Sequence, residues 1–507
     1  MKKHVRLLLA ALCIYLLLLC LLLAAERTAD GSAIRSFGDA LWYSLITITT
    51  VGYGDLSPVT PPGRLIGILF ALSSVGILAA LIGIALKLVG GRLIPGIRLF
   101  FSRNRDWAVF HEANEESLAL AKALIRENPD CTVILPPEGA GTLPGAVCFP
   151  PEAEKLAALR GSSSGLSFFF LGEDPWENIS AALVPAGRQL PAYCMSSGTG
   201  SDLPEDLHLF SREDALARFY WQQYPLQRKE KTLVFIGCGP SGSALLERAL
   251  LTNVFEAGRK TIYHVFQDDS GFRQLHPVLA AALDPSSSTG DVLVFHEENW
   301  EAARELLESA DRILLCSDSD GQNLSVFRTL KTWFAGQAPI HVRLETPVPG
   351  VVSFGSLEEL FTPGFVIRDD LNRRAMLIND LYNRNVAHPV PWRELSPFLQ
   401  QSNIAAADHL DDKARILLGE DAPAVLTASD FRNAFDKYRA LMPEKADFFR
   451  EIEHRRWLRF YQLYNWQYSP QRNDALRLHP QLLPYEQLSR EEQKKDDFAW
   501  ELLGLLE

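Results

Sequence analysis

The sequence predicts a membrane-embedded helical domain, two parallel α/β units and a smaller, mainly helical C-terminal domain. Three observations support this fold class. Two long apolar stretches without charge lie in the first 90 residues. Short apolar runs then alternate with helical patterns, and this alternation occurs twice, as expected for parallel sheets. From residue 392 onward the chain becomes helical in pattern and rich in charge and tryptophan.

The two apolar stretches are long enough to cross a lipid bilayer. Residues 7–25 and 65–86 contain no charged side chain, and about 20 apolar residues span the hydrocarbon core. Lysine and arginine precede the first stretch and follow the second. The positive-inside rule then predicts a multi-pass protein of the cell (inner) membrane with cytosolic N- and C-termini. A cleaved signal peptide is the alternative interpretation of the first stretch.

Charge and cysteine content exclude two classes of function. The net charge is −12 over 507 residues, so nucleic acid is not an expected partner. The seven cysteines are scattered and no two have CxxC spacing. The sequence therefore predicts neither a zinc site nor a disulfide framework.

A short glycine-containing motif lies between the apolar stretches. An amphipathic segment at 39–49 is followed by Thr50-Val-Gly-Tyr-Gly-Asp55. Residues 5–90 thereby resemble the two-span pore domain of potassium channels, whose selectivity-filter motif is TVGYGD. The resemblance implies a pore helix at 39–49. It also implies a filter made of Thr50, Val51, Gly52, Tyr53, Gly54 and Asp55.

The residue types in this motif suit the coordination of K⁺. A dehydrated K⁺ needs rings of oxygen in place of water, and four chains would supply them from the backbone carbonyls of residues 50–53. The carbonyls point one way only if alternate residues take left-handed backbone angles, which glycine adopts at least cost. Gly52 and Gly54 stand at such positions. A filter with one strand per subunit requires a homotetramer.

Two glycines in the second apolar stretch have two interpretations. Gly76 and Gly83 would serve either as a gating hinge in a pore-lining helix or as close-packing contacts between helices. The sequence favours neither interpretation.

A second glycine motif follows a predicted strand at 232–236. It reads Gly237-Cys-Gly-Pro-Ser-Gly242 and precedes a predicted helix at 243–251. In such a GxGxxG turn the glycines make the tight turn, let a phosphate approach the backbone, and let helix and strand pack. An acidic residue after the next strand would bind a ribose. The candidate nucleotide-binding residues are Gly237, Gly239, Ser241, Gly242, Asp268 and Asp269.

The stretch around this motif resembles the RCK (regulator of K⁺ conductance) domain, a Rossmann-type module attached to many such channels. The segment 354–362 and the helix predicted near 369–382 are similar to the end of that family. The resemblance implies a nucleotide-type ligand, NAD(H) or another nucleotide. The alternative is a Rossmann fold that keeps its glycines only for packing.

The first α/β unit lacks these glycines. Its turn reads His111-Glu-Ala-Asn-Glu-Glu-Ser117, and the glutamates at 112, 115 and 116 would repel a phosphate. We therefore expect this unit to be structural or to bind something other than a dinucleotide.

The C-terminal region carries the motifs E-H-x-x-W, W-x-Y, R-x-D, H-P and L-x-P-Y-x-x-L in that order. This series resembles the RyR domain, first described as a repeat in ryanodine receptors, although Asn465 stands where a glycine is usual. The resemblance implies a helical pocket for a nucleotide or related small molecule. Its ligand candidates are Trp457, Trp466, Tyr468, Arg472 and Tyr485. The alternative is that these side chains form the core of a small helical fold.

The expected organisation has five segments. They are a pore domain at 1–90, a basic linker at 91–105, a degenerate Rossmann-like unit at 106–224, a Rossmann unit at 229–387 and a RyR-like domain at 392–507. The expected function is a ligand-gated, potassium-selective channel subunit rather than an enzyme, because no catalytic group is arranged near the glycine motif. The alternatives are a membrane-anchored NAD(P)-dependent enzyme and a non-conducting nucleotide sensor.

Overall fold

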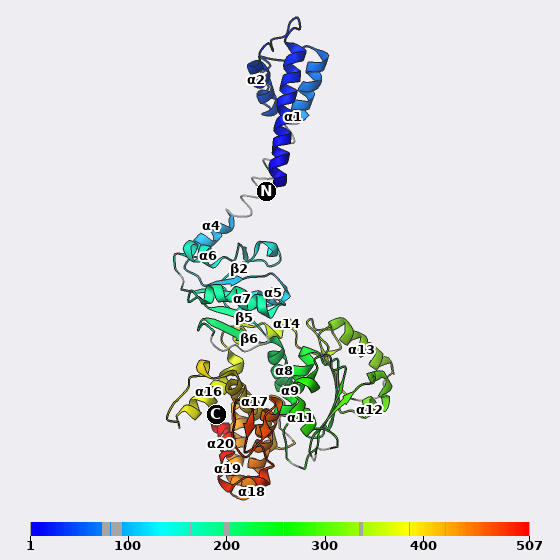
Figure 1. The fold of residues 1–507 in the computed structure, drawn as a ribbon, viewed down its shortest axis with the longest axis vertical. Helices are drawn as coiled ribbons and strands as arrows, with labels where there is room; N and C mark the ends of the chain where they lie inside the picture. Colours follow the sequence, from blue (N-terminus) through cyan, green and yellow to red (C-terminus); the bar gives the residue numbers. More distant parts are fainter. Residues whose placement is uncertain are drawn as a thin grey trace. The chain divides into compact units, whose positions relative to one another are not determined.

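The computed structural model describes a set of segments that covers most of the chain. These are residues 2–72, 82, 94–162, 164–196, 203–256, 258–286, 288, 290–333, 338–384, 386–420 and 422–505. The chain divides into two compact units, Met1–Phe101 and Ser102–Glu507. Figure 1 shows the ribbon coloured along the sequence.

The first unit is helical. Its helices are α1 (Lys2–Glu26), α2 (Phe37–Ile48) and α4 (Ile94–Phe101), and residues 61–72 are also helical. A capping box formed by Ser36 and Asp39 begins α2. α1, α2 and the 61–72 segment meet in a small cluster that includes Leu19, Leu22, Ala40 and Phe70. Gly67 has no room for a side chain, because an added Cβ would lie 2.5 Å from the Tyr43 hydroxyl oxygen.

Within the described residues of the chain, none of the helices has both the length and the apolarity required to cross a bilayer. Most of the predicted second stretch, 65–86, lies outside the described residues, and so do the hinge candidates Gly76 and Gly83. The side chains of residues 2–12 lie outside them as well.

The second unit contains two six-stranded sheets, the first with the order β3-β2-β1-β4-β5-β6. Every neighbouring pair in it is parallel. Its strands are β1 (Trp107–Phe110), β2 (Thr132–Leu135), β3 (Val147–Cys148), β4 (Leu166–Phe170), β5 (Ala192–Met195) and β6 (Leu207–Phe210). Its helices are α5 (Glu115–Glu127), α6 (Ala153–Arg160) and α7 (Pro175–Ala186).

The second sheet repeats this plan, with the order β12-β11-β10-β7-β8-β9 and parallel pairs throughout. Its strands are β7 (Thr232–Ile236), β8 (Ile262–Phe266), β9 (Val292–His296), β10 (Arg312–Leu315), β11 (Ile340–Arg343) and β12 (Val352–Phe354). Its helices are α9 (Pro240–Thr252), α10 (Phe272–Leu275), α11 (Pro277–Ala282), α12 (Arg304–Ser309) and α13 (Asp320–Trp333). Numbered from their own first strands, both sheets have the Rossmann order 3-2-1-4-5-6. The predicted pair of parallel α/β units is confirmed.

One asparagine in each copy binds the same set of backbone groups. Asn178 of α7 accepts from the Gly172 amide at 2.9 Å and donates to the Gly172 carbonyl and to the end of the neighbouring strand. Asn323 of α13 accepts from the Ser317 amide at 3.0 Å and donates to the Ser317 carbonyl and again to the neighbouring strand end. Each side chain therefore ties two strand ends together, which supports an internal repeat.

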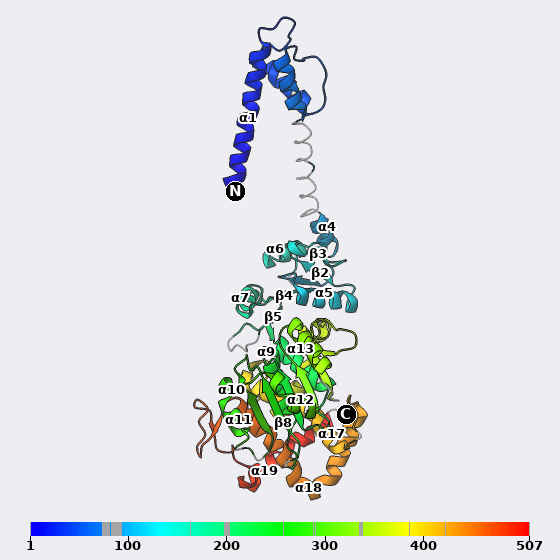
Figure 2. The ribbon, with the colours of Figure 1, turned by 90° about the vertical axis from the view of Figure 1, so that its right-hand side faces the viewer.

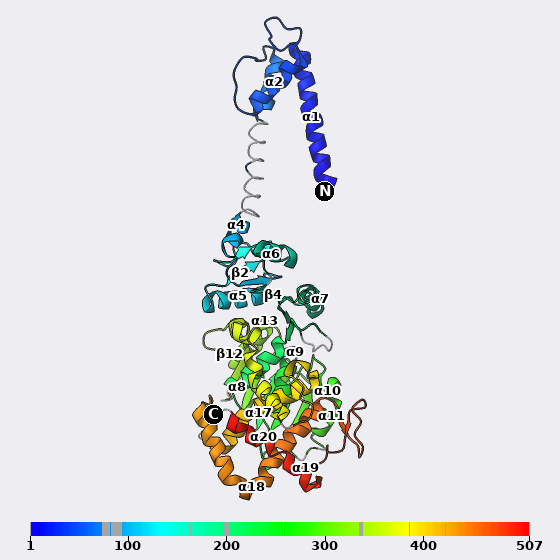
Figure 3. The ribbon, with the colours of Figure 1, turned by 90° about the vertical axis from the view of Figure 1, so that its left-hand side faces the viewer.

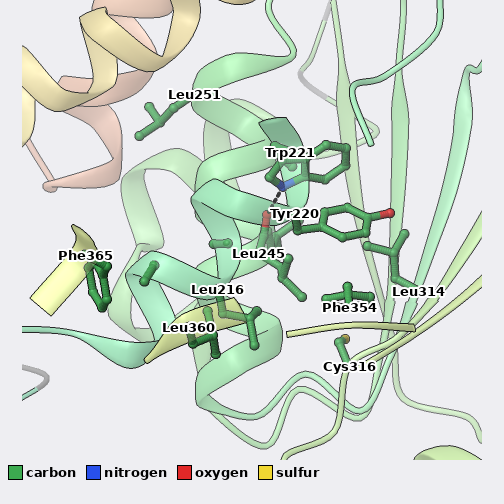
Figure 4. Close-up of a cluster of buried hydrophobic side chains, with 14 of the residues drawn as sticks. Leu216, Tyr220, Trp221, Leu245, Leu251, Leu314, Cys316, Phe354, Leu360 and Phe365 are labelled. Atoms are coloured by element: carbon green, nitrogen blue, oxygen red, sulfur yellow. Dashed lines mark hydrogen bonds between the residues drawn. The ribbon is translucent and has the colours of Figure 1, made fainter. Parts of the chain in front are cut away.

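α8 (Arg212–Gln223) connects the two copies and packs against α9. Figure 4 shows Tyr220 and Trp221 of α8 in a buried apolar cluster with Leu245 of α9 and Leu314 of β10. The Trp221 Nε1 group donates to the Leu245 carbonyl at 2.9 Å. This hydrogen bond joins the two helices and leaves the buried indole satisfied.

The two faces of the second sheet are covered by different helices. α12 and α13 contribute Leu307 and Leu330 to a cluster on one face with Val234 and Ile313. α8 and α9 cover the other face, as the opposite positions of α13 and α9 in Figure 1 show. α9 is buried on nearly all sides because it is enclosed by the sheet, α8 and the C-terminal helices.

The C-terminal helices pack on the second copy. They are α17 (Pro397–Leu418), α18 (Ala428–Leu463), α19 (Arg490–Lys495) and α20 (Phe498–Glu501). α17 and α18 both contact α9, and α18 also contacts α11; Figures 2 and 3 show the two sides of this region. Arg455 of α18 donates to the Phe255 carbonyl at 3.1 Å, and the His276 ring lies 2.7 Å from the Leu463 carbonyl oxygen. Polar contacts therefore add to the apolar packing.

Shorter elements complete the described chain. The short helices are α14 (Leu357–Leu360), α15 (Pro363–Val366) and α16 (Arg373–Asn383), and the two-residue strands are β13 (Gln467–Tyr468) and β14 (Leu478–His479). The 3₁₀ turns are Pro137–Gly139, Trp300–Ala302, Asp370–Asn372, Trp392–Glu394, Tyr485–Gln487 and Leu502–Leu505. α14 and α15 contact α5 of the first copy, so the chain after the second sheet returns to the first.

A buried charge cluster joins α8, α9 and α17. Arg218 of α8 and Arg248 of α9 lie 2.8 and 2.9 Å from Asp408 of α17. Arg248 also lies 2.7 Å from Asp214 of α8. Burial by itself would raise the pKa of Asp214, but Arg248 and Arg218 lower it below its ordinary value. The cluster links the three helices through Arg218, Arg248 and Asp408, which are at most 8% exposed, whereas the Asp214 side chain is 33% exposed.

A second buried ion pair offers a stability test. Arg312 on β10 lies 2.6 Å from Glu230, and the two residues are 4% and 5% exposed. The substitution Arg312→Met leaves the Glu230 charge buried without its partner, so we expect the free energy of unfolding to fall by about 3–5 kcal/mol. Urea unfolding of the purified chain measures the loss.

The exposed pair Arg304–Glu308 provides the matched control. Its atoms are 2.8 Å apart, but the Arg304 side chain is 66% exposed. Arg304→Met should therefore cost less than about 1 kcal/mol. Equal losses for the two variants would contradict a special role for the buried pair.

Candidate functional site

Backbone hydrogen bonds tie residues 50–52 to the C-terminal end of α2. The Thr50 amide donates to the Thr47 carbonyl at 3.1 Å. The amides of Val51 and Gly52 both donate to the Ile46 carbonyl, at 2.9 and 3.1 Å. The last turn of α2 therefore positions the start of the motif that the sequence identifies as a filter.

Left-handed backbone recurs at every second residue of this segment. Gly52 and Gly54 have φ of +58° and +76°, at the two places where the motif supplies glycine. Thr50 has φ of +58° as well, which is rare for a β-branched residue. The sequence does not indicate this angle at Thr50, because threonine carries no signal for it.

An aromatic pair braces the segment from the side of α2. The rings of Trp42 and Tyr53 are stacked, with centroids 6.3 Å apart and an angle of 7° between their planes. The Trp42 Nε1 group donates to the Asp55 carboxylate at 2.9 Å. The residue between the two glycines and the residue after them are therefore both in contact with one indole on the helix.

A buried carboxylate holds the chain that follows the segment. Glu26, the last residue of α1, accepts hydrogen bonds from the amides of Val59 and Thr60 at 3.1 and 2.9 Å. A Cβ on Gly63 would overlap this carboxylate. Sequence reasoning missed Glu26, because an acid at a helix end carries no sign of a partner more than thirty residues away.

The glycine turn of the second copy lies between β7 and α9. Gly237 has φ of +81°, and an added Cβ there would lie 2.8 Å from the Ser317 Cβ. An added Cβ on Gly242 would lie 2.9 Å from the Cys316 Sγ. Both glycines therefore let this turn pack against the end of β10. α9 begins at Pro240, earlier than the predicted 243, because proline suits the first position of a helix.

The two acidic candidates after β8 differ in availability. The Asp268 carboxylate accepts from the Phe272 amide at 2.9 Å and from the Ser270 hydroxyl at 3.1 Å, so it is engaged in its own turn. Asp269 is exposed. The geometry therefore makes Asp269 the more available partner for a ribose.

Side chains, rather than glycines, organise the corresponding turn of the first copy. Asn114 caps α5 by accepting from the Ser117 amide at 2.9 Å. Glu116 lies 2.9 Å from Arg212 of α8, which also pairs with Glu345. The expectation that Glu116 would repel a phosphate did not include this pairing, because Arg212 is 96 residues away in sequence.

The structure separates the C-terminal ligand candidates. Trp466 and Tyr485 are 7% and 9% exposed, whereas Tyr468 is 50% exposed. Trp457 and Trp466 both pack around His479, with ring centroids 5.2 and 6.3 Å from it. This packing favours the interpretation of the two tryptophans as core.

Arg472, the remaining candidate, is exposed and pairs with Asp474 at 2.7 Å. Tyr468 and Arg472 thus remain at the surface, where a ligand can reach them.

Asn465 stands at the position where the sequence resemblance predicts a glycine. Its φ is +60°, an angle that glycine adopts freely and that asparagine tolerates better than most residues. Its side chain donates to the Leu275 carbonyl at 2.8 Å. The asparagine therefore keeps the turn and adds a contact to the second copy that glycine lacks.

A second charge cluster is buried in the C-terminal region. Lys413 and Arg456 lie 2.8 and 2.6 Å from Glu453. The Asp496 carboxylate lies 3.8 Å from His454 Nδ1. Burial, together with the charge of Glu453, raises the pKa of Asp496 to about 8.

Comparisons with known proteins found similarity within the first unit. Residues 6–90 match the family model of ion channels. A 58-residue stretch is 48% identical to a voltage-gated potassium channel of Aeropyrum pernix and covers 11% of this chain and 20% of that protein. A 56-residue stretch is 39% identical to the calcium-gated potassium channel TvoK of Thermoplasma volcanium, covering 11% and 16%.

A mouse relative, potassium voltage-gated channel subfamily A member 5, is 45% identical over 51 residues, which cover 10% of this chain and 8% of that protein. The chain thus spans at most a fifth of the length of these curated relatives.

Solved structures show a distant likeness over more of the chain. One is described as GsuK bound to ADP, with 16% identity and a TM-score of 0.34, covering 72% of this chain and 99% of that chain. Another, the GsuK channel bound to NAD, has 14% identity and a TM-score of 0.34, covering 73% and 85%. A likeness at this TM-score is too weak to transfer binding properties.

The raised pKa of Asp496 predicts a pH dependence of stability. The folded chain keeps this proton up to about pH 8, whereas an unfolded aspartate loses it near pH 3.9. Unfolding between these values releases a proton, so stability falls as pH rises. The parent should lose up to about 1.4 kcal/mol of its free energy of unfolding per pH unit in this range. Asp496→Asn should lack this contribution. Urea unfolding at mildly acidic and neutral pH measures it, and identical pH slopes for both proteins would contradict it.

Proposed function

We propose that this chain is one subunit of a potassium-selective channel whose conduction depends on a nucleotide-type ligand bound by the second unit. The observation that carries the proposal is the recurrence of left-handed backbone at Thr50, Gly52 and Gly54. These residues lie in the region that matches the ion-channel family. In TVGYGD such alternation lets successive backbone carbonyls face one axis, which is what a dehydrated K⁺ requires.

A homotetramer in a lipid bilayer follows from this chemistry. One chain supplies a single line of carbonyls, and four chains around an axis complete each ring of oxygens. In the single chain Val51 and Tyr53 are 51% and 69% exposed, although both are large and apolar or aromatic. Burial of these side chains against neighbouring subunits would account for their exposure here.

The glycine turn of the second copy is the proposed ligand site. It stands at the carboxyl end of β7, next to the point where the strand order reverses between β7 and β10, which is where open α/β sheets bind ligands. The N-terminus of α9, where Ser241 has the first backbone amide, would receive a phosphate. NAD(H) and adenine nucleotides have the phosphates and ribose that this turn and Asp269 would hold.

The C-terminal region would transmit or tune the response. α9 starts at the glycine turn. Its Arg248 forms ion pairs with Asp214 of α8 and with Asp408 of α17. A ligand that shifts the start of α9 would therefore act on all three helices. Gating still requires that the ligand bind the open and closed states with different affinity.

Substitution of Gly52 tests the proposed filter. In Gly52→Ala the added methyl meets no neighbouring atom, but alanine is strained at a φ of +58°, by roughly 1–2 kcal/mol in each subunit. The residue should relax to ordinary angles and turn its carbonyl away from the axis. We expect the preference for K⁺ over Na⁺, or conduction itself, to be lost in planar bilayers, with assembly intact.

Gly96→Ala is the matched control, because Gly96 in α4 has open space and no left-handed angle. It should conduct as the parent does. An unchanged K⁺/Na⁺ ratio in Gly52→Ala would count against the filter, and cofactor turnover without current would favour a membrane-anchored enzyme.

Substitution of Gly239 tests the proposed ligand site. Gly239→Asp brings an added carboxylate to the turn that would receive a phosphate, so we expect it to abolish the rise in thermal unfolding midpoint caused by NAD(H) or ADP. Gly258→Asp adds the same charge at an exposed glycine with open space around it and should keep the rise. Persistence of the rise in Gly239→Asp would place the ligand elsewhere, foremost in residues 392–507.

A further inference from the structure

The turn after β10 places a carboxylate at the start of α9. β7 and β10 are parallel neighbours, so the turns at their carboxyl ends lie together. Asp318 belongs to the second of these turns, and its Oδ1 accepts a hydrogen bond from the Ser241 amide at 3.3 Å. A Cβ added to Gly239 would overlap the Asp318 Oδ2. The carboxylate therefore lies directly against the backbone of the glycine turn.

α9 has no cap of its own. Its N-cap residue is Gly239, which has no side chain to accept a hydrogen bond, and Pro240 has no amide hydrogen. Ser241 is thus the first residue of the helix with an amide to donate. Asp318 supplies the missing acceptor from 77 residues away, and a negative charge at a helix N-terminus is favourable. The contact compensates for a deficiency in the local sequence of α9.

We propose that Asp318 occupies the phosphate position of the glycine turn, so that a phosphate-bearing ligand binds there only when this side chain turns away. The inference rests on the proposed ligand site. A phosphate oxygen would need the Ser241 amide and the space beside Gly239, and the carboxylate holds both. Asp318 is exposed to solvent, so it can rotate outward. The Asp318 carboxylate and the phosphate of the ligand therefore compete for the same site.

The first copy contains a related arrangement with the roles reversed. There the acid is Glu112 on the turn after β1, and the glycine is Gly172 after β4. A Cβ added to Gly172 would lie 2.6 Å from the Glu112 Oε1. α5 has its own cap in Asn114, so Glu112 is not needed as one. Only in the second copy does the carboxylate between the two turns also cap a helix that a ligand would use.

Isothermal titration of the purified full-length chain tests the competition. Asp318→Asn keeps the shape and an acceptor oxygen but removes the charge. Because like charges in one anion site cost several kilocalories per mole, we expect affinity for ADP and for inorganic pyrophosphate to rise by at least about tenfold. Adenosine, which has no phosphate, should bind the variant and the parent alike. Asp318→Ser provides a second uncharged variant should the asparagine fold poorly.

Two controls test whether the gain in affinity comes from the contact between Asp318 and the glycine turn. Glu305→Gln removes one negative charge from an exposed position on α12 and should leave the affinity for ADP unchanged. In the double variant Asp318→Asn with Gly239→Asp, the gain in affinity should disappear, because a carboxylate returns to the turn. A gain that survives in the double variant would overturn the inference.

The outcomes also separate this inference from the proposed function. Equal ADP affinity in the parent and in Asp318→Asn overturns the inference and leaves the ligand site standing. If neither ADP nor pyrophosphate binds the parent or Asp318→Asn, both the ligand site and the inference are wrong. A tenfold gain for ADP without any change for adenosine supports both.

Discussion

Consecutive backbone carbonyls turn to one side only if the backbone alternates between left-handed and other angles, and that constraint governs the first unit. Left-handed angles cost little at Gly52 and Gly54 but are unfavourable at Thr50. The strained residue sits where the Thr47 and Ile46 carbonyls of α2 bind the segment. The Trp42 indole binds Asp55 directly after the glycines, and the buried Glu26 carboxylate holds Val59 and Thr60 further along the chain. The surrounding structure thus supports a backbone that threonine alone would avoid.

The two α/β copies show how one scaffold diverges at a single turn. Both keep the strand order and the asparagine that ties two strand ends together. The second copy keeps its glycines, so its turn packs against the end of β10, and the Ser241 amide at the start of α9 donates to Asp318. The first copy replaces the glycines by side chains, and its Asn114 and Glu116 bind groups within the protein. A turn built from glycines and a turn built from side chains are therefore two outcomes of the same topology.

The C-terminal region gains its role from where it packs. α17 and α18 lie against α9, the helix that begins at the candidate ligand site. Asn465 binds the Leu275 carbonyl, and Arg248 and Asp408 form a buried ion pair between α9 and α17. Because the Arg248 and Asp408 side chains are only 6% and 8% exposed, each depends on the other across the interface. The region thus contacts both α9, which begins at the candidate ligand site, and the helices α10 and α11.

The sequence by itself determined the elements whose signal is local. The TVGYGD and GxGxxG motifs, the two series of parallel strands and the absence of glycines from the first copy are all legible within a few residues, because backbone angle and apolar periodicity are local properties. Contacts between distant segments carry no such signal. Nothing in the sequence pairs Glu116 with Arg212, places Asp318 beside Gly239, or distinguishes the buried Trp466 from the exposed Tyr468. Only the tertiary structure decided which charges meet and which aromatic rings are enclosed, since that depends on how separate elements pack.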